Sequence, residues 1–116
     1  MEEENPVDQI RNEQIEKYLA SQRDNIVEDL FTLARIPSVR GEAAPDKPYG
    51  EEVARALDAA LAQCEREGMQ TENLGYRCGS ALWRAEGAGE KELALVAHLD
   101  VVPAGDGWSG KPFEPF

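Results

Sequence analysis

The sequence has 116 residues, which is enough for one small domain and excludes a multidomain machine. Hydrophobic residues make up 41% and charged residues 30%, so the chain is too apolar to be wholly disordered. The 23 acidic residues outnumber the 12 lysines and arginines, and the resulting formal charge of -11 repels phosphate backbones and anionic lipids, which argues against nucleic acid as a partner.

Neither a targeting signal nor a membrane span is visible. Residues 1–5 are acidic rather than basic, and no apolar run approaches the ~18 residues of a span. We therefore expect no membrane partner and a cytoplasmic location. Cys64 and Cys78 lack the spacing of a metal knuckle or a redox pair, which predicts two ordinary reduced thiols.

The first third of the chain is predicted to be helical. Between Val7 and Ile36 strong helix formers dominate, and apolar residues recur at intervals of three and four. This pattern predicts one long or two abutting amphipathic helices, with Asp24 and Asn25 as caps of the second. Pro37 is expected to end it at Ile36, because proline disfavours helical geometry in the residue before it. A loop follows over residues 38–50.

A further helix is predicted over Glu51–Glu67. Its apolar residues fall on one stripe, and Gly68 is placed to end it as a left-handed cap. The stripe consists of Val53, Leu57, Ala60, Leu61 and Cys64.

Three short strands are predicted after Gly68, because glycine-containing turns separate three segments that no longer follow a helical period. They are Met69–Leu74, Ser80–Ala85 and Glu92–Leu99. The last contains an apolar run without alternation, which is typical of a strand buried on both faces of a sheet. Helices followed by strands predict an α/β domain, and residues 101–116 are expected to form a loop.

The single histidine, His98, stands where the last predicted strand ends. Side chains two apart on a strand point the same way, so His98 and Asp100 are expected on one face, roughly 7 Å apart at their Cα atoms. An imidazole can bind zinc while a carboxylate fixes its tautomer. A His-x-Asp spacing alone, however, more often belongs to a hydrogen-bonded structural pair than to a metal site. A catalytic zinc also needs about three protein ligands. The residue chemistry alone leaves the function open.

Two segments near the end of the chain resemble a known family. They are residues 97–108, with the sequence Ala-His-Leu-Asp-Val-Val-Pro-Ala-Gly-Asp-Gly-Trp, and residues 112–115, with the sequence Pro-Phe-Glu-Pro. They resemble the signature of the di-zinc peptidase family that includes aminoacylase, acetylornithine deacetylase, succinyl-diaminopimelate desuccinylase, carboxypeptidase G and bacterial dipeptidases. Leu33–Val39 and Pro48–Gly50 match in the right order, so the resemblance covers about residues 25–116. Within this family, Gly75-Tyr76 and the Gly-Asp-Gly-Trp sequence at residues 105–108 favour the dipeptidase branch.

The resemblance implies that His98 binds one zinc ion and that Asp100 is the catalytic aspartate, which orients the His98 ring. It further implies two zinc ions in the complete enzyme, with cobalt or manganese as alternatives, a small peptide as substrate, and a homodimer formed through a domain that this chain lacks. In members of this family, the other zinc ligands lie further along the sequence. We therefore expect an incomplete amino-terminal part of a zinc-peptidase catalytic domain, with residues 1–24 as a helical extension and residues 25–116 ending in the loop after the His-x-Asp strand.

The function implied is that of a zinc-dependent dipeptidase, a metallopeptidase in which metal-activated water hydrolyses the peptide bond. The isolated chain is expected to be inactive, because most of the site would be missing. Two alternatives stay open: an N-acyl amino acid deacylase of the acetylornithine deacetylase or desuccinylase type, and a non-catalytic scaffold remnant that has lost its metals.

Overall fold

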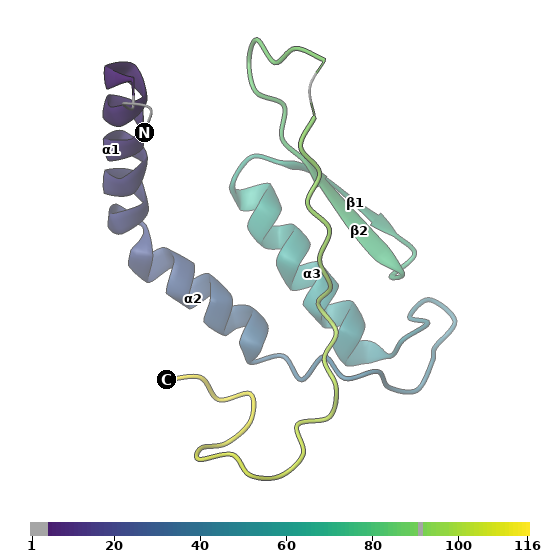
Figure 1. The fold of residues 1–116 in the computed structure, drawn as a ribbon. Coiled ribbons are helices and arrows are strands. Elements are labelled where there is room, and N and C mark those ends of the chain that lie inside the picture. The colour runs from purple at the N-terminus through teal and green to yellow at the C-terminus, as the bar shows by residue number, and fades with distance from the viewer. Residues whose placement is uncertain (1–4, 91) are drawn as a thin grey trace. The chain divides into compact units, whose positions relative to one another are not determined.

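The computed structural model describes residues 5–90 and 92–116 (Figure 1). In this part of the chain, three α-helices precede a two-stranded antiparallel sheet, which confirms the α/β class. The chain divides into two compact units, with the boundary between Phe31 and Thr32. The predicted domain boundary between residues 24 and 25 stays a prediction. None of the described helices combines the length and the hydrophobicity that crossing a bilayer requires.

Two abutting helices, α1 (Pro6–Ser21) and α2 (Arg23–Ala34), occupy the first third of the described chain, as predicted. Asn5 caps α1, because its side-chain oxygen accepts a hydrogen bond from the backbone N–H of Val7 at 3.0 Å. The predicted caps of α2 are wrong. Asp24 and Asn25 follow Arg23 inside the helix, and the amide of Asn25 instead donates to the side-chain oxygen of Gln22 at 3.0 Å.

Helix α3 (Glu51–Arg66) ends as the sequence predicts. Gly68 has a φ of +85°, and its N–H donates to the carbonyl of Glu65 at 2.9 Å, while the N–H of Met69 donates to the carbonyl of Cys64 at 3.1 Å. These two bonds form a Schellman motif, which satisfies carbonyls that the end of a helix would otherwise leave unpaired.

The sheet consists of β1 (Gln70–Leu74) and β2 (Cys78–Leu82), paired from Gln70 opposite Leu82 to Leu74 opposite Cys78. The second strand therefore begins two residues earlier than predicted. Helix α3 packs on both strands (Figure 1). At Gly79 a Cβ atom would lie 2.8 Å from Leu57 and 3.0 Å from Leu61, so the absent side chain lets the helix approach the strand closely.

The predicted third strand, Glu92–Leu99, is wrong as a paired strand. Residues 92–100 belong to no helix and to no ladder among the described residues, and Leu93, Leu95 and Val96 are 87%, 88% and 97% exposed. A strand requires a neighbour for its backbone groups, and an apolar run cannot supply one by itself. Pairing begins only at Val101, which forms a parallel bridge with Val39. Residues 102–116 form a loop, as predicted, whereas Val101 was wrongly assigned to that loop.

Candidate functional site

His98 and Asp100 lie together on one side of the backbone, as predicted. The ring Nδ1 of His98 is 2.9 Å from the carbonyl oxygen of Asp100 and 3.4 Å from its carboxylate Oδ1. Both side chains are exposed, at 84% for His98 and 62% for Asp100. A carbonyl oxygen can only accept, so the 2.9 Å contact assigns the proton to Nδ1 and leaves the lone pair of the neutral ring on Nε2. That nitrogen is the one available to a ligand.

A cleft of about 360 Å³ lies beside this pair. Its lining comes from the loop before α3, from α3 itself, from the hairpin turn and β2, and from residues 97–100. The lining residues are Arg40, Tyr49, Val53, Leu57, Tyr76, Arg77, Cys78, Gly79, Ala97, His98, Leu99 and Asp100. The cleft thus combines apolar and aromatic side chains with a few charged groups on one concave surface, as small-ligand sites do.

The arginines of the cleft were not singled out by the sequence. Arg40 stands over the ring of Tyr49, with its guanidinium carbon 5.5 Å from the ring centroid, which is a cation–π distance. Arg77 lines the same cleft. These two cations lie near Asp100 in a chain whose net charge is -11, so the cleft is locally less acidic than the chain as a whole.

Tyr76 reaches the cleft from an unusual backbone conformation. Gly75 and Tyr76 form the centre of the hairpin turn with φ of +64° and +55°, and the N–H of Arg77 donates to the carbonyl of Leu74 at 3.3 Å. Positive φ at both central residues is typical of a type I′ turn, although a bulky residue rarely adopts it. The side-chain oxygen of Asn73 accepts from the N–H of Tyr76 at 2.8 Å and helps to hold this conformation.

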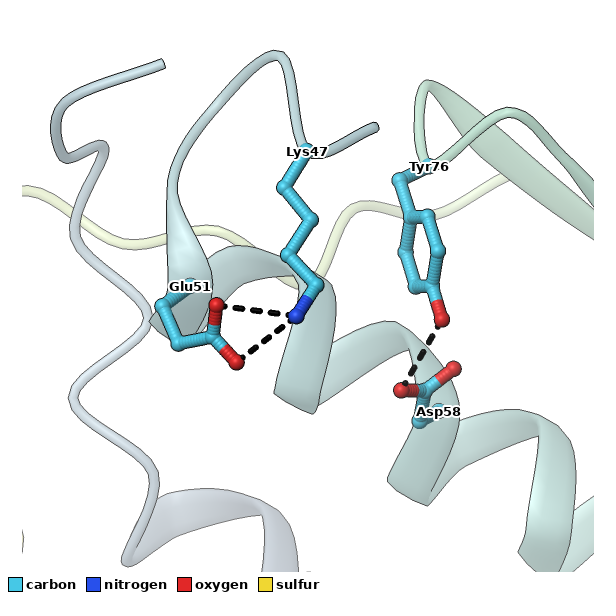
Figure 2. Close-up of polar contacts among 4 residues, drawn as sticks. All are labelled: Lys47, Glu51, Asp58 and Tyr76. Atoms are coloured by element: carbon cyan, nitrogen blue, oxygen red, sulfur yellow. Dashed lines mark hydrogen bonds and ion pairs between the residues drawn. The ribbon is translucent and has the colours of Figure 1, made fainter. Parts of the chain in front are cut away.

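Two polar contacts tie neighbouring segments to α3, one from Tyr76 of the cleft and one from Lys47 in the loop before the helix (Figure 2). The hydroxyl of Tyr76 donates to Asp58 Oδ2 at 3.2 Å, and this hydrogen bond raises the pKa of the phenol above its ordinary value of 10.0. The ammonium of Lys47 donates to both carboxylate oxygens of Glu51, at 2.8 and 2.9 Å, and this contact raises the pKa of Lys47 above 10.5. Figure 2 shows both contacts on the same face of α3.

The raised pKa values predict a loss of stability in alkali. Each group binds its proton more tightly in the folded chain, so its contribution to the free energy of unfolding is full below the ordinary pKa and is lost as the pH rises through the raised value. Urea unfolding from about pH 9 to pH 11 should show this decline, and Tyr76→Phe should make it shallower. Tyr18→Phe, which removes a phenol from α1, is the matched control. An equal decline in all three proteins would contradict the assignment.

The described residues do not supply a complete zinc site. In residues 5–90 and 92–116, no three side chains of His, Cys, Asp or Glu gather closely enough to hold a metal ion. His98 and Asp100 provide one imidazole and one carboxylate, whereas catalytic zinc sites use about three protein ligands. Cys78 lines the cleft as a free thiol, and Cys64 is also free. The predicted roles of His98 and Asp100 therefore remain predictions.

Comparison with known proteins relates the chain to dipeptidases. No protein family model matches it. The chain is 39% identical over 93 residues to "Putative dipeptidase YtjP" of Bacillus subtilis strain 168, a match that covers 78% of the chain and 19% of that protein. It is also 39% identical over 106 residues to a similarly named protein of Staphylococcus aureus strain USA300, which covers 89% of the chain and 21% of that protein. The chain thus spans about a fifth of the length of relatives that are named as dipeptidases.

Proposed function

We propose that these 116 residues belong to a longer parent protein that is a zinc-dependent dipeptidase. The observation that carries the proposal is the 39% identity to a Staphylococcus aureus relative named as a dipeptidase, over 89% of the chain. An alignment of that extent leaves too few residues outside it to omit His98 or Asp100, so the matched stretch includes the exposed pair beside the cleft.

The geometry of the pair supports the proposed roles. His98 is assigned as one metal ligand, because Nε2 carries the lone pair while Nδ1 donates to Asp100. Asp100 is proposed as the catalytic aspartate that orients the ring, because its carbonyl accepts from Nδ1 at 2.9 Å and its carboxylate lies 3.4 Å from the same nitrogen. A bound zinc ion supplies a water of lowered pKa and polarises the scissile carbonyl. The other ligands belong to the remaining four-fifths of the parent protein.

The same proposal includes a small peptide substrate, two zinc ions with cobalt or manganese as alternative metals, a cytoplasmic location, and homodimerisation through residues outside this chain. The cleft beside His98, at about 360 Å³, is of a size that suits a small ligand.

The test is an assay of the purified parent protein on unblocked dipeptides and, in parallel, on acetylornithine and other N-acyl amino acids. We expect hydrolysis of the dipeptides that is lost on chelation and restored by zinc. Hydrolysis of the N-acyl substrates alone would assign a deacylase instead, and inactivity on both would favour a non-catalytic scaffold.

The 116-residue chain alone is expected to show no zinc-dependent turnover, because the described residues provide too few ligands. Turnover by the isolated chain that a chelator and His98→Ala both abolish would contradict this expectation. The chain and the parent protein should therefore be assayed side by side.

A further inference from the structure

Ser38 is a buried polar residue in the Leu33–Val39 stretch, where the sequence assigned it no role of its own. It lies four residues after α2, is only 3% exposed, and contacts a segment 61 residues further along the chain. Its hydroxyl donates to the carbonyl of Leu99 at 2.8 Å, and its own carbonyl accepts the N–H of Val101 at 3.1 Å. One buried serine thus bonds to the backbone on both sides of Asp100.

These two bonds fix the orientation of consecutive peptide groups. The peptide group between Asp100 and Val101 donates its N–H to Ser38 and accepts the His98 Nδ1–H, 2.9 Å away, at its carbonyl. Because a trans peptide is planar and its N–H and C=O point in opposite directions, holding the N–H also sets the direction of the carbonyl. The preceding peptide group, between Leu99 and Asp100, is held through its carbonyl by the Ser38 hydroxyl.

The need of a buried hydroxyl for a hydrogen-bond partner does not by itself explain which partner Ser38 has. A buried hydroxyl needs a hydrogen-bond partner, but any nearby carbonyl would satisfy it. Ser38 instead bonds to the residue between His98 and Asp100, next to the parallel bridge between Val39 and Val101. Its position is therefore linked to the direction of the carbonyl that holds the imidazole.

We propose that Ser38 is the positioning residue of the His98 ring: it holds the backbone of residues 99–101 so that the Asp100 carbonyl keeps the proton on Nδ1 and leaves Nε2 free to bind a ligand. The importance of this for metal binding rests on the proposed function. The tautomer itself does not, and it can be measured without metal.

The experiment uses the single histidine of the chain, since every imidazole signal then comes from His98. Long-range ¹⁵N–¹H correlation spectra, recorded without metal at about pH 8.5 where an ordinary imidazole is neutral, distinguish the two tautomers through ring C–H protons. We expect mainly the Nδ1–H tautomer in the unchanged chain. Ser38→Ala keeps the backbone bond to Val101 but removes the hydroxyl bond that holds the peptide group between Leu99 and Asp100. Loss of this one bond is expected to lower the ratio of Nδ1–H to Nε2–H about five-fold.

Two further variants make the comparison specific. Ser38→Thr retains the hydroxyl and should keep the ratio of the unchanged chain, and Ser109→Ala removes an exposed serine from the loop after Asp100 and should also leave it unchanged. A predominant Nε2–H tautomer in the unchanged chain would overturn the proposal, and so would an unaltered ratio in Ser38→Ala.

If the amide spectrum shows that Ser38→Ala does not fold, Ser38→Cys replaces it, because a thiol is a weaker donor of similar position. A ratio of Nδ1–H to Nε2–H in Ser38→Cys below that of the unchanged chain supports the proposal, and an equal ratio overturns it. A parent protein that lacks dipeptidase activity but shows these tautomer ratios would refute the proposed function and leave the role of Ser38 standing.

Discussion

His98→Ala is expected to lower kcat/KM of the parent protein for dipeptides by more than ~100-fold, which exceeds the usual cost of removing a residue that only supports a metal ligand. The reason is that the described residues hold one imidazole, whose free Nε2 is the proposed ligand atom. Zinc content measured on the same preparation should fall with the activity.

Asp100→Asn should have a smaller effect, of about 10–100-fold, because an amide keeps the size of the side chain but loses the charge beside Nδ1. Asp106→Asn makes the same chemical change six residues later, at an exposed position, and should leave kcat/KM unaltered. Full activity and full zinc content in His98→Ala would refute the assignment of the ligand. Equal losses in the two aspartate variants would indicate a nonspecific effect of charge.

Gly50→Ala is expected to destabilise the fold more than any other small substitution of the loop before α3. Gly50 has a φ of +97°, and an added Cβ would lie 2.8 Å from the Cα, 2.9 Å from the N and 3.0 Å from the C of Gly41. The backbone conformation costs an alanine about 1–3 kcal/mol, and the clash adds about 1–3 kcal/mol because backbone atoms cannot move aside like a flexible side chain.

Gly68→Ala separates these two causes. Gly68 has a similar φ of +85°, but no atom lies within 4 Å of its added Cβ, so only the conformational cost applies. Urea unfolding of both variants should give a larger loss of unfolding free energy for Gly50→Ala. Equal losses would show that Gly41 and Gly50 do not approach each other as closely as described.

The sequence predicted best those elements whose signals are local. The glycine that ends α3 is confirmed, because its signal lies within one continuous segment. The predicted apolar stripe is confirmed only in part: Leu57 and Leu61 face Gly79 of β2, but the buried residues of the helix are Ala54 and Ala56, which the stripe left out. His98 and Asp100 lie side by side, as predicted, since only two positions separate them. The run Glu92–Leu99 predicted a buried strand, yet pairing depends on a second segment that the run itself does not specify.

The contacts of Ser38 and Tyr76 could not be predicted, because they depend on distant segments of the chain. Ser38 resembles an ordinary loop serine until the chain brings Leu99 to it. Tyr76 follows a glycine in a turn, and nothing in its residue type indicates that it takes a positive φ and bonds to Asp58 on α3. Such contacts join segments distant in sequence, which composition and periodicity do not encode.

The long span between Ser38 and Leu99 also bears on the order in which the chain folds. The hairpin and α3 are neighbours in sequence and close small loops, whereas the Ser38 contact closes a loop of 61 residues and carries a larger entropic cost. During refolding, amide protons of α3 and the hairpin should therefore gain protection from exchange first. The imidazole should reach its final orientation in the last step, so that a newly made chain acquires its secondary structure before its ligand-binding geometry.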